Sequence, residues 1–358
     1  MKKLLNIIIV LFFIPIALNA TEIDKFKHEK SKTIKKEFTV NADALMKINN
    51  RYGNVDVISW DGNRIVIDVK ITVSGNDEDK VVNRLDMIDV EFENSRSEVS
   101  AKTVIQKKSS GWSWSWWRNN NVNYQIDYKI KVPVTNSVNL TNDYGNISLN
   151  EIKGDAKLNC NYGKIIIGEL YSDNNEININ YTNDSSIGLM NGGTINANYS
   201  KFTIEEAENI RLNADYTTSA FENIKNLNYN CDYGSLRVDK ASSVVGNGDY
   251  LSVKLGAISK EVKMEADYGS ISIEELQNGF DIVTVNGDYC GVKIGIPNVP
   301  FDFILNLSYG NFKHDEGKFE LTKQIVKSST KYYEGYFKSQ NSGSTIKINS
   351  DYGGVTFF

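Results

Sequence analysis

The stretch Asn142-Asp143-Tyr144-Gly145-Asn146-Ile147-Ser148-Leu149 recurs along this chain in degenerate copies. Each copy has an alternating apolar run, then Asn, a small residue, Asp or Asn, and a Tyr that is usually followed by Gly or Ser. From Tyr144 to Tyr309, successive tyrosines of the series are 17 to 21 residues apart, which is typical of a repeat protein. The series comprises Tyr52, Tyr144, Tyr162, Tyr181, Tyr199, Tyr216, Tyr233, Tyr250, Tyr268, Tyr289, Tyr309 and Tyr352.

The side chains that face inward follow from positions counted from each Tyr. Apolar residues recur at −6, −4, +3, +5 and +8, and small residues recur at −2. The Tyr has the parity of the residues before it, so alternation along a strand predicts that its ring belongs to the buried row. The parity changes after the Tyr, and the frequent Gly at +1 suits a corner there. We therefore expect each repeat to form two short strands and to have one further inward-facing position.

A chain that revisits one side-chain pattern at this spacing stacks its coils as parallel strands about 4.8 Å apart. The sequence thus predicts an all-β fold, a parallel β-helix (β-solenoid) of ~18-residue coils. In a left-handed β-helix the apolar marks repeat every six residues, and here they do not. A right-handed form is therefore favoured.

The chain of 358 residues divides into three parts. Residues 1–20 read as a secretory signal peptide, because two lysines precede a short apolar run that ends at Asn19-Ala20. We expect an exported protein of the periplasm or cell surface, with no transmembrane segment after signal cleavage. Residues 21–135 read as an antiparallel β cap containing the first coil motif, and 136–358 as the solenoid, with a hairpin insertion at 313–345. Within these parts we expect a tight hairpin turn at Asp61-Gly62, a short helix at 77–85, and a hairpin of 321–326 with 332–337 before the last coil.

Composition argues against several classes of function. The formal net charge is −5, and loss of Lys2 and Lys3 makes the mature chain more negative, which disfavours nucleic-acid binding. Only two histidines are present, and no phosphate loop, metal-ligand cluster or nucleophile elbow is found. We therefore expect no catalytic residues, no metal and no cofactor. Cys160 and Cys231 fall in one row but four coils apart, and Cys290 falls in another row three coils further on, so three free and mostly buried thiols are predicted.

Two outward columns form the first candidate site. Asn at −3 and Asp at −1 recur in successive coils, and at parallel-strand spacing they would form a flat polar face. Such a face could bind a glycan, a cell-wall polymer or a row of cations. The structural alternative is that Asn side chains form amide ladders and Asp side chains cap backbone amides. The columns include Asn159, Asn178, Asn196, Asn213, Asn230, Asn247, Asp215, Asp232, Asp249, Asp267 and Asp288.

A tryptophan-rich stretch forms the second candidate site. Trp112, Trp114, Trp116 and Trp117 lie between polar segments, as at the tip of a hairpin. Exposed aromatic rows bind sugars or partner proteins or enter membrane interfaces. The alternative is that the tip folds back and fills the core of the cap.

The phrase at 142–149 and its repeats resemble the bacterial putative-adhesin family of exported β-strand-repeat proteins, over about 35–358. The resemblance implies a right-handed β-solenoid in the cell envelope or at the surface, with an adhesive or scaffolding role. No binding residues carry over from it. We expect a non-catalytic protein that binds a glycan, a cell-wall polymer or an envelope protein. The alternatives are a purely structural periplasmic solenoid and, less favoured, a polysaccharide-active β-helix enzyme.

Overall fold

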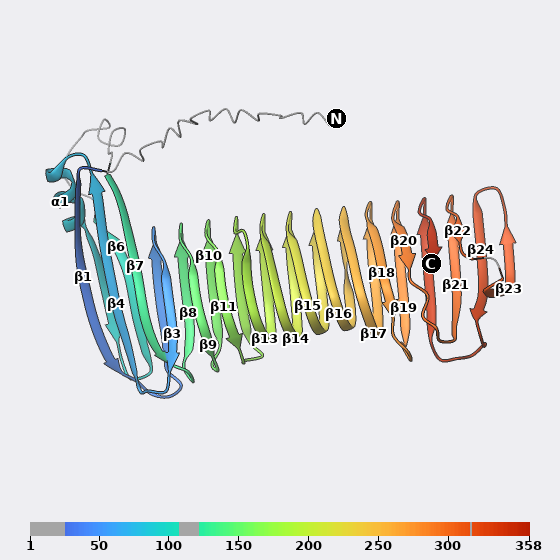
Figure 1. Ribbon diagram of the computed structural model, residues 1–358, viewed down its shortest axis with the longest axis horizontal. Helices are drawn as coiled ribbons and strands as arrows, with labels where there is room; N and C mark the ends of the chain where they lie inside the picture. Colours follow the sequence, from blue (N-terminus) through green and yellow to red (C-terminus); the bar gives the residue numbers. More distant parts are fainter. Residues whose placement is uncertain (1–25, 107–121, 316) are drawn as a thin grey trace, which may run out of the picture.

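The computed structural model describes residues 26–106, 122–315 and 317–358. Within these residues the protein is nearly all β, and its 26 strands belong to one long open sheet. The strands stack along the long axis, with the N-terminal strands at one end and the C-terminal hairpin at the other (Figure 1). No helix in the described part of the chain is long and apolar enough to span a membrane.

Strands of successive repeats pair in parallel and in register. Asn159 pairs with Asn178, Asn178 with Asn196 and Asn196 with Asn213, so partners recur at the spacing of the tyrosines. A coil is the segment around one Tyr of the series. The strands of the coils are β2 (Leu45–Arg51), β3 (Val55–Trp60), β8 (Ser137–Asp143), β9 (Ile147–Ile152), β10 (Ala156–Asn161), β11 (Ile165–Leu170), β12 (Asn175–Asn180), β13 (Ser185–Asn198), β14 (Lys201–Asp215), β15 (Thr218–Asp232), β16 (Gly234–Asp249), β17 (Leu251–Asp267), β18 (Ser270–Leu276), β19 (Ile282–Asp288), β20 (Gly291–Ile294), β21 (Phe301–Ser308), β22 (Phe312–Lys313), β25 (Thr345–Asp351) and β26 (Val355–Phe357).

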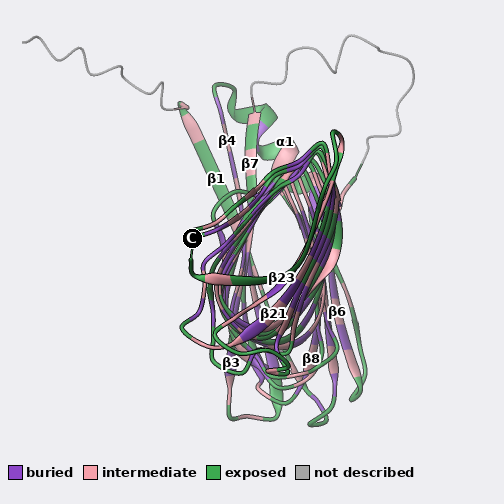
Figure 2. Ribbon diagram, turned by 90° about the vertical axis from the view of Figure 1, so that its right-hand side faces the viewer, coloured by how far each residue is buried: buried purple, intermediate pink, exposed green. Residues whose placement is uncertain are grey.

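The inward rows form one continuous hydrophobic core. Around Tyr144, Ile147, Leu149 and Ile152 at +3, +5 and +8 are buried, and the same positions are buried in most of the coils that follow. In the coil of Tyr181 the buried positions are shifted by one residue, to Ser185, Ile187 and Met190. Figure 2 looks along the long axis and shows the strands of successive coils behind one another, with buried and more exposed residues alternating along them. The predicted inward positions are confirmed in most coils, and in the coil of Tyr181 Met190 is buried in place of Leu189. Because one coil covers the apolar face of the next, the stack buries what a single coil cannot.

The prediction that the tyrosine rings are buried is wrong. All twelve tyrosines have a positive φ, between 51° and 63°, which is the left-handed region. This conformation turns the chain at the Tyr itself, so the ring points outward and the next residue takes the inward place. Thr182, Ser200 and Thr217, each at +1, are accordingly buried. The strand alternation therefore ends one residue earlier than the sequence pattern implied.

Glycine at +1 is needed for close packing and not for an unusual φ. A Cβ on Gly145 would lie 1.8 Å from the carbonyl oxygen of Gly53 in the adjacent coil, and one on Gly163 would lie 2.0 Å from that of Gly145. Neither glycine is among the residues of positive φ. At these coils the backbones approach so closely at the corner that a side chain has no room.

Antiparallel strands enclose the N-terminal end of the stack. They are β1 (His28–Thr39), β4 (Arg64–Gly75), β5 (Ile88–Asn94), β6 (Glu98–Ile105) and β7 (Val122–Pro133), with helix α1 (Glu78–Met87) after β4. Strand β4 pairs antiparallel with both β1 and β7, and β5 pairs antiparallel with β6. Helix α1 begins after Asp77, whose carboxylate accepts a bond from the Lys80 amide, so the predicted short helix is confirmed.

The predicted hairpin at Asp61-Gly62 is wrong. These residues connect β3 to β4, but β7 lies between the two strands, parallel to β3 and antiparallel to β4. Strands β6 and β7 add parallel partners to the coil of Tyr52, on the side away from the coil of Tyr144.

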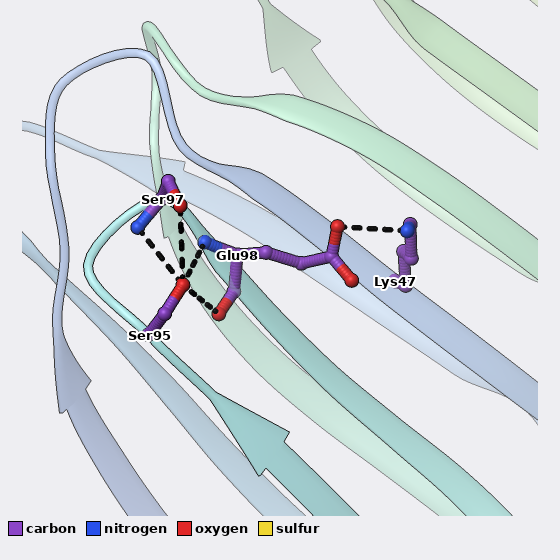
Figure 3. A network of polar contacts seen from close by, with 4 residues as sticks. All are labelled: Lys47, Ser95, Ser97 and Glu98. Atoms are coloured by element: carbon purple, nitrogen blue, oxygen red, sulfur yellow. Dashed lines mark hydrogen bonds and ion pairs between the residues drawn. The ribbon is translucent and has the colours of Figure 1, made fainter.

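The turn between β5 and β6 is fixed by a small polar network (Figure 3). The Ser95 hydroxyl accepts bonds from the amides of Ser97 and Glu98 at 3.2 and 3.0 Å. The Lys47 ammonium on β2 donates to the Glu98 carboxylate at 2.7 Å. This ion pair joins the hairpin to the first coil across the β2–β6 pairing.

At the C-terminal end the chain doubles back. The predicted hairpin is confirmed as β23 (Phe319–Val326) paired antiparallel with β24 (Thr330–Phe337), and β24 pairs with β21. The last coil, however, does not stack beyond its predecessor in the sequence. Strand β25 lies between β19 and β21, so Tyr352 sits between Tyr289 and Tyr309.

The cysteines behave as small core residues. Cys160, Cys231 and Cys290 are free and buried, as predicted. Burial raises the pKa of the first two thiols to about 12 and that of Cys290 to about 11, because the thiolate would lose its hydration. They are therefore poor nucleophiles in the folded state.

Candidate binding surface of stacked tyrosines and polar columns

The twelve tyrosines form a continuous ladder along the outside of the molecule. Neighbouring rings have centroids 4.7 to 5.2 Å apart and planes within 1 to 7° of parallel. Eleven of the twelve residues are exposed, from 46% at Tyr233 to 65% at Tyr309. Tyr52, the remaining member, meets the Tyr124 ring edge-on at 5.1 Å at the N-terminal end. This tyrosine ladder follows the corner at which the two strands of each coil meet.

The backbone conformation makes tyrosine a costly choice at this corner. A residue with a Cβ in the left-handed region loses roughly 1–2 kcal/mol, and Gly, Asn and Asp adopt the region most readily. The chain nevertheless places tyrosine there twelve times. The ring itself must therefore contribute something that Asn or Gly would not, through stacking, through binding, or through both.

Stacking determines what the ladder presents to a partner. Each inner ring has its faces against its neighbours, so ring edges and phenol hydroxyls form the outer surface. Partial desolvation, followed by the adjacent tyrosines, raises the pKa of Tyr233 and of Tyr352. These hydroxyls therefore remain protonated at neutral pH and can both donate and accept hydrogen bonds.

The Asn column at −3 is a hydrogen-bonded amide ladder. The amide of Asn178 donates to Asn159 Oδ1 at 2.9 Å, Asn196 donates to Asn178 at 2.8 Å, and Asn213 donates to Asn196 at 2.8 Å. From Asn159 to Asn213 each amide donates toward the N-terminal end, so the dipoles of these side chains are aligned. Glu265 occupies the place between Asn247 and Asn286 and interrupts the column.

The column at −1 is adjacent to the tyrosines in sequence, and its residue type changes from Asn to Asp along the stack. Asn180 and Asn198 continue an amide ladder, each donating to the preceding coil at 3.0 Å. The following five coils have aspartates. The backbone amide of Asp249 donates to Asp232 Oδ1 at 2.9 Å, and that of Asp288 donates to Asp267 Oδ1 at 3.0 Å. Some carboxylates thus cap backbone amides, as in the structural interpretation.

All predicted members of the two columns lie on one outer face, and none is buried. The structure brings them together beside the tyrosine ladder. Among the described residues, no three His, Cys, Asp or Glu side chains are grouped to hold a metal ion. Trp112, Trp114, Trp116 and Trp117 lie outside the described residues.

Sequence reasoning missed the tyrosines as surface residues. One signal could have revealed them: the parity of the apolar positions changes across the Tyr, and a residue in the left-handed region can produce such a change.

Comparisons with known proteins give structural neighbours only. No family model matches the chain, and no curated protein matches it. A putative cell adhesion protein from Clostridium sporogenes is 12% identical, with 92% of this chain and 99% of that chain covered and a TM-score of 0.19. A putative adhesin from Parabacteroides distasonis is 13% identical, with 75% and 93% covered and a TM-score of 0.31. The chain is similar to putative adhesins.

One more solved structure has a different name. A putative lipid binding protein from Parabacteroides distasonis is 14% identical, with 91% of this chain and 96% of that chain covered and a TM-score of 0.29. The adhesin names agree with the family resemblance of the repeat phrase. At these identities and TM-scores, the structural neighbours assign no function to this chain.

Proposed function

We propose that the chain is a non-catalytic, exported protein of the cell envelope or surface that binds an extended glycan or cell-wall polymer. In this proposal the sheet forms a right-handed parallel β-solenoid, and the binding surface is the tyrosine ladder with its flanking Asn and Asp columns. The observation that supports it best is that twelve tyrosines, eleven of them exposed, occupy a backbone region that tyrosine disfavours.

The chemistry of this surface favours a polyhydroxylated partner. Hydroxyl, amide and carboxylate groups are the polar groups that bind sugar hydroxyls, and here the tyrosine rings repeat every 4.7 to 5.2 Å along the stack beside the two polar columns. A linear polymer with a regular repeat could use many weak contacts at once, and multivalent binding multiplies weak affinities. The negative net charge disfavours nucleic acid as the extended partner.

The test uses the mature chain and isolated cell-wall polysaccharide in a sedimentation assay. The triple variant Tyr199→Asn, Tyr216→Asn, Tyr233→Asn removes three adjacent rings while keeping a residue type that tolerates the left-handed region. We expect its binding to fall at least fivefold with unchanged circular dichroism. The control Tyr171→Asn changes an exposed tyrosine outside the ladder and should bind normally. Equal binding by the triple variant and the wild type would favour a purely structural role for the ladder.

The tryptophan stretch is a second candidate for the same role. Replacing Trp112, Trp114 and Trp116 with Ala in the same assay separates it from the ladder. Loss of binding in that variant alone would assign the binding to the stretch. Release of soluble sugars from the polymer by the wild-type chain would instead favour the enzymatic alternative.

A further inference from the structure

A cleft of about 520 Å³ lies where the C-terminal hairpin meets the last coils. Strands β24 and β23 continue the sheet beyond β21, so five strands, β19, β25, β21, β24 and β23, lie side by side. One row crosses all five: Asn286, Asn349, Asn306, Tyr332 and Ile325 are successive partners. All five residues line the cleft.

One wall of the cleft is the end of the Asn column. Asn349 donates to Asn286 Oδ1 and Asn306 donates to Asn349 Oδ1, both at 2.8 Å. The column therefore ends with Asn306 Oδ1 directed toward the hairpin strands, where it can accept a hydrogen bond. Asp288 and Asp351 lie on the same wall, two residues further along their strands.

The other side of the cleft, on and beside β23, is basic. Lys323 and Lys327 on and beside β23 line the cleft, and the Lys323 ammonium lies 5.1 Å from the centre of the Tyr332 ring. No described carboxylate forms an ion pair with either lysine. Lys331 is different, because its ammonium donates to the Gly310 carbonyl at 3.0 Å and to the Asn311 side chain. Two lysines thus lie on the β23 side of the cleft, and the amides and carboxylates lie on the side formed by β19, β25 and β21.

The geometry points to a binding site for an acidic saccharide, such as a uronic acid residue of a glycan. Lys323 and Lys327 would hold the carboxylate of the sugar. Asn306, Asp288 and Asp351 would bind its hydroxyls, and Tyr332 with Ile325 would face its apolar side. The volume is in the range of small-molecule sites, about 300–1,000 Å³. This inference rests on the proposed glycan-binding role, but it concerns different residues from the tyrosine ladder.

The test measures binding of tetragalacturonate to the mature chain by titration calorimetry, with the uncharged galactotetraose of the same linkage as a comparison. We expect the acidic oligosaccharide to bind at least tenfold more tightly. The double variant Lys323→Gln, Lys327→Gln should remove that preference, a tenfold loss being about 1.4 kcal/mol. The control Lys293→Gln changes an exposed lysine on β20, outside the cleft, and should bind normally. Thr330→Trp, which fills the cleft from an exposed position, should abolish binding of both oligosaccharides.

The outcomes separate this inference from the proposed function. Loss of tetragalacturonate binding in the cleft variants, with normal binding in the triple tyrosine variant, supports the cleft even if the polymer assay fails. Equal affinity for the two oligosaccharides, or equal binding by wild type and the double lysine variant, overturns the assignment to an acidic sugar. No binding of either oligosaccharide overturns the site.

Discussion

Stacking between neighbouring tyrosines should appear as a coupling energy between adjacent rings. Tyr199 and Tyr216 have centroids 4.8 Å apart and planes within 4°. Aromatic pairs of this kind contribute about 0.5–1.5 kcal/mol beyond the area they bury. Replacing Tyr216 by Asn removes two such pairs, about 2 kcal/mol, and relieves about 1 kcal/mol of left-handed strain. The single variant should therefore be destabilised by about 1 kcal/mol.

A double-mutant cycle isolates the ring pair, because the strain relief at each site cancels in the cycle. We expect the double variant Tyr199→Asn, Tyr216→Asn to be more stable by about 1 kcal/mol than the sum of the single losses predicts. Urea unfolding followed by circular dichroism gives the free energies, provided that the m-value is unchanged. The pair Tyr199 and Tyr250, whose rings are not neighbours, is the control and should be additive within about 0.5 kcal/mol. A coupling between the adjacent pair no larger than that of the control pair would refute the stacking argument.

Three further predictions concern the amide ladder, a buried thiol and the corner glycine. Asn196→Ala breaks two bonds of 2.8 Å and should lower the free energy of unfolding by about 1–2 kcal/mol in urea titrations. Cys160, with its pKa raised to about 12, is almost wholly protonated at pH 8. It should therefore react with a thiol reagent only in denaturant. Fast labelling of Cys160 in the folded protein would contradict its burial. Gly145→Ala should cost about 1–3 kcal/mol because its Cβ meets the Gly53 carbonyl, whereas Gly291→Ala, with open space around it, should cost less than about 0.5 kcal/mol.

Periodicity was enough to predict the coils and their inward rows. In most coils the residues at +3, +5 and +8 are buried because a sheet with one covered face requires apolar side chains at fixed parity. The Asn column could also be predicted, since identical residues at a fixed offset must lie in one row. The bonding direction of its amides, as from Asn196 to Asn178, could not, because either orientation satisfies the sequence.

The orientation of the tyrosine rings could not be derived from alternation alone. Alternation assumes extended backbone through Tyr144, whereas its φ of 60° reverses the side on which the next residue points. The order in which the coils stack could not be predicted from the sequence either. Spacing along the chain does not reveal that Tyr352 is inserted between Tyr289 and Tyr309, because strand β25 carries the same repeat pattern wherever it pairs.

This reversal of chain order connects the two proposed binding regions. Because β25 occupies the place beside β19, the coil of Tyr309 is displaced outward and becomes the last ring of the ladder, and the most exposed at 65%. The residue before it, Ser308, lines the cleft beneath the hairpin. The end of the tyrosine ladder and the cleft are therefore adjacent, and the aligned amides of the Asn column end at the same place. If both proposals hold, a glycan held at one acidic residue in the cleft can continue along the ladder, and the cleft would set the direction in which the polymer lies. A triple tyrosine variant that still binds tetragalacturonate but no longer binds the polymer is the result that this arrangement requires.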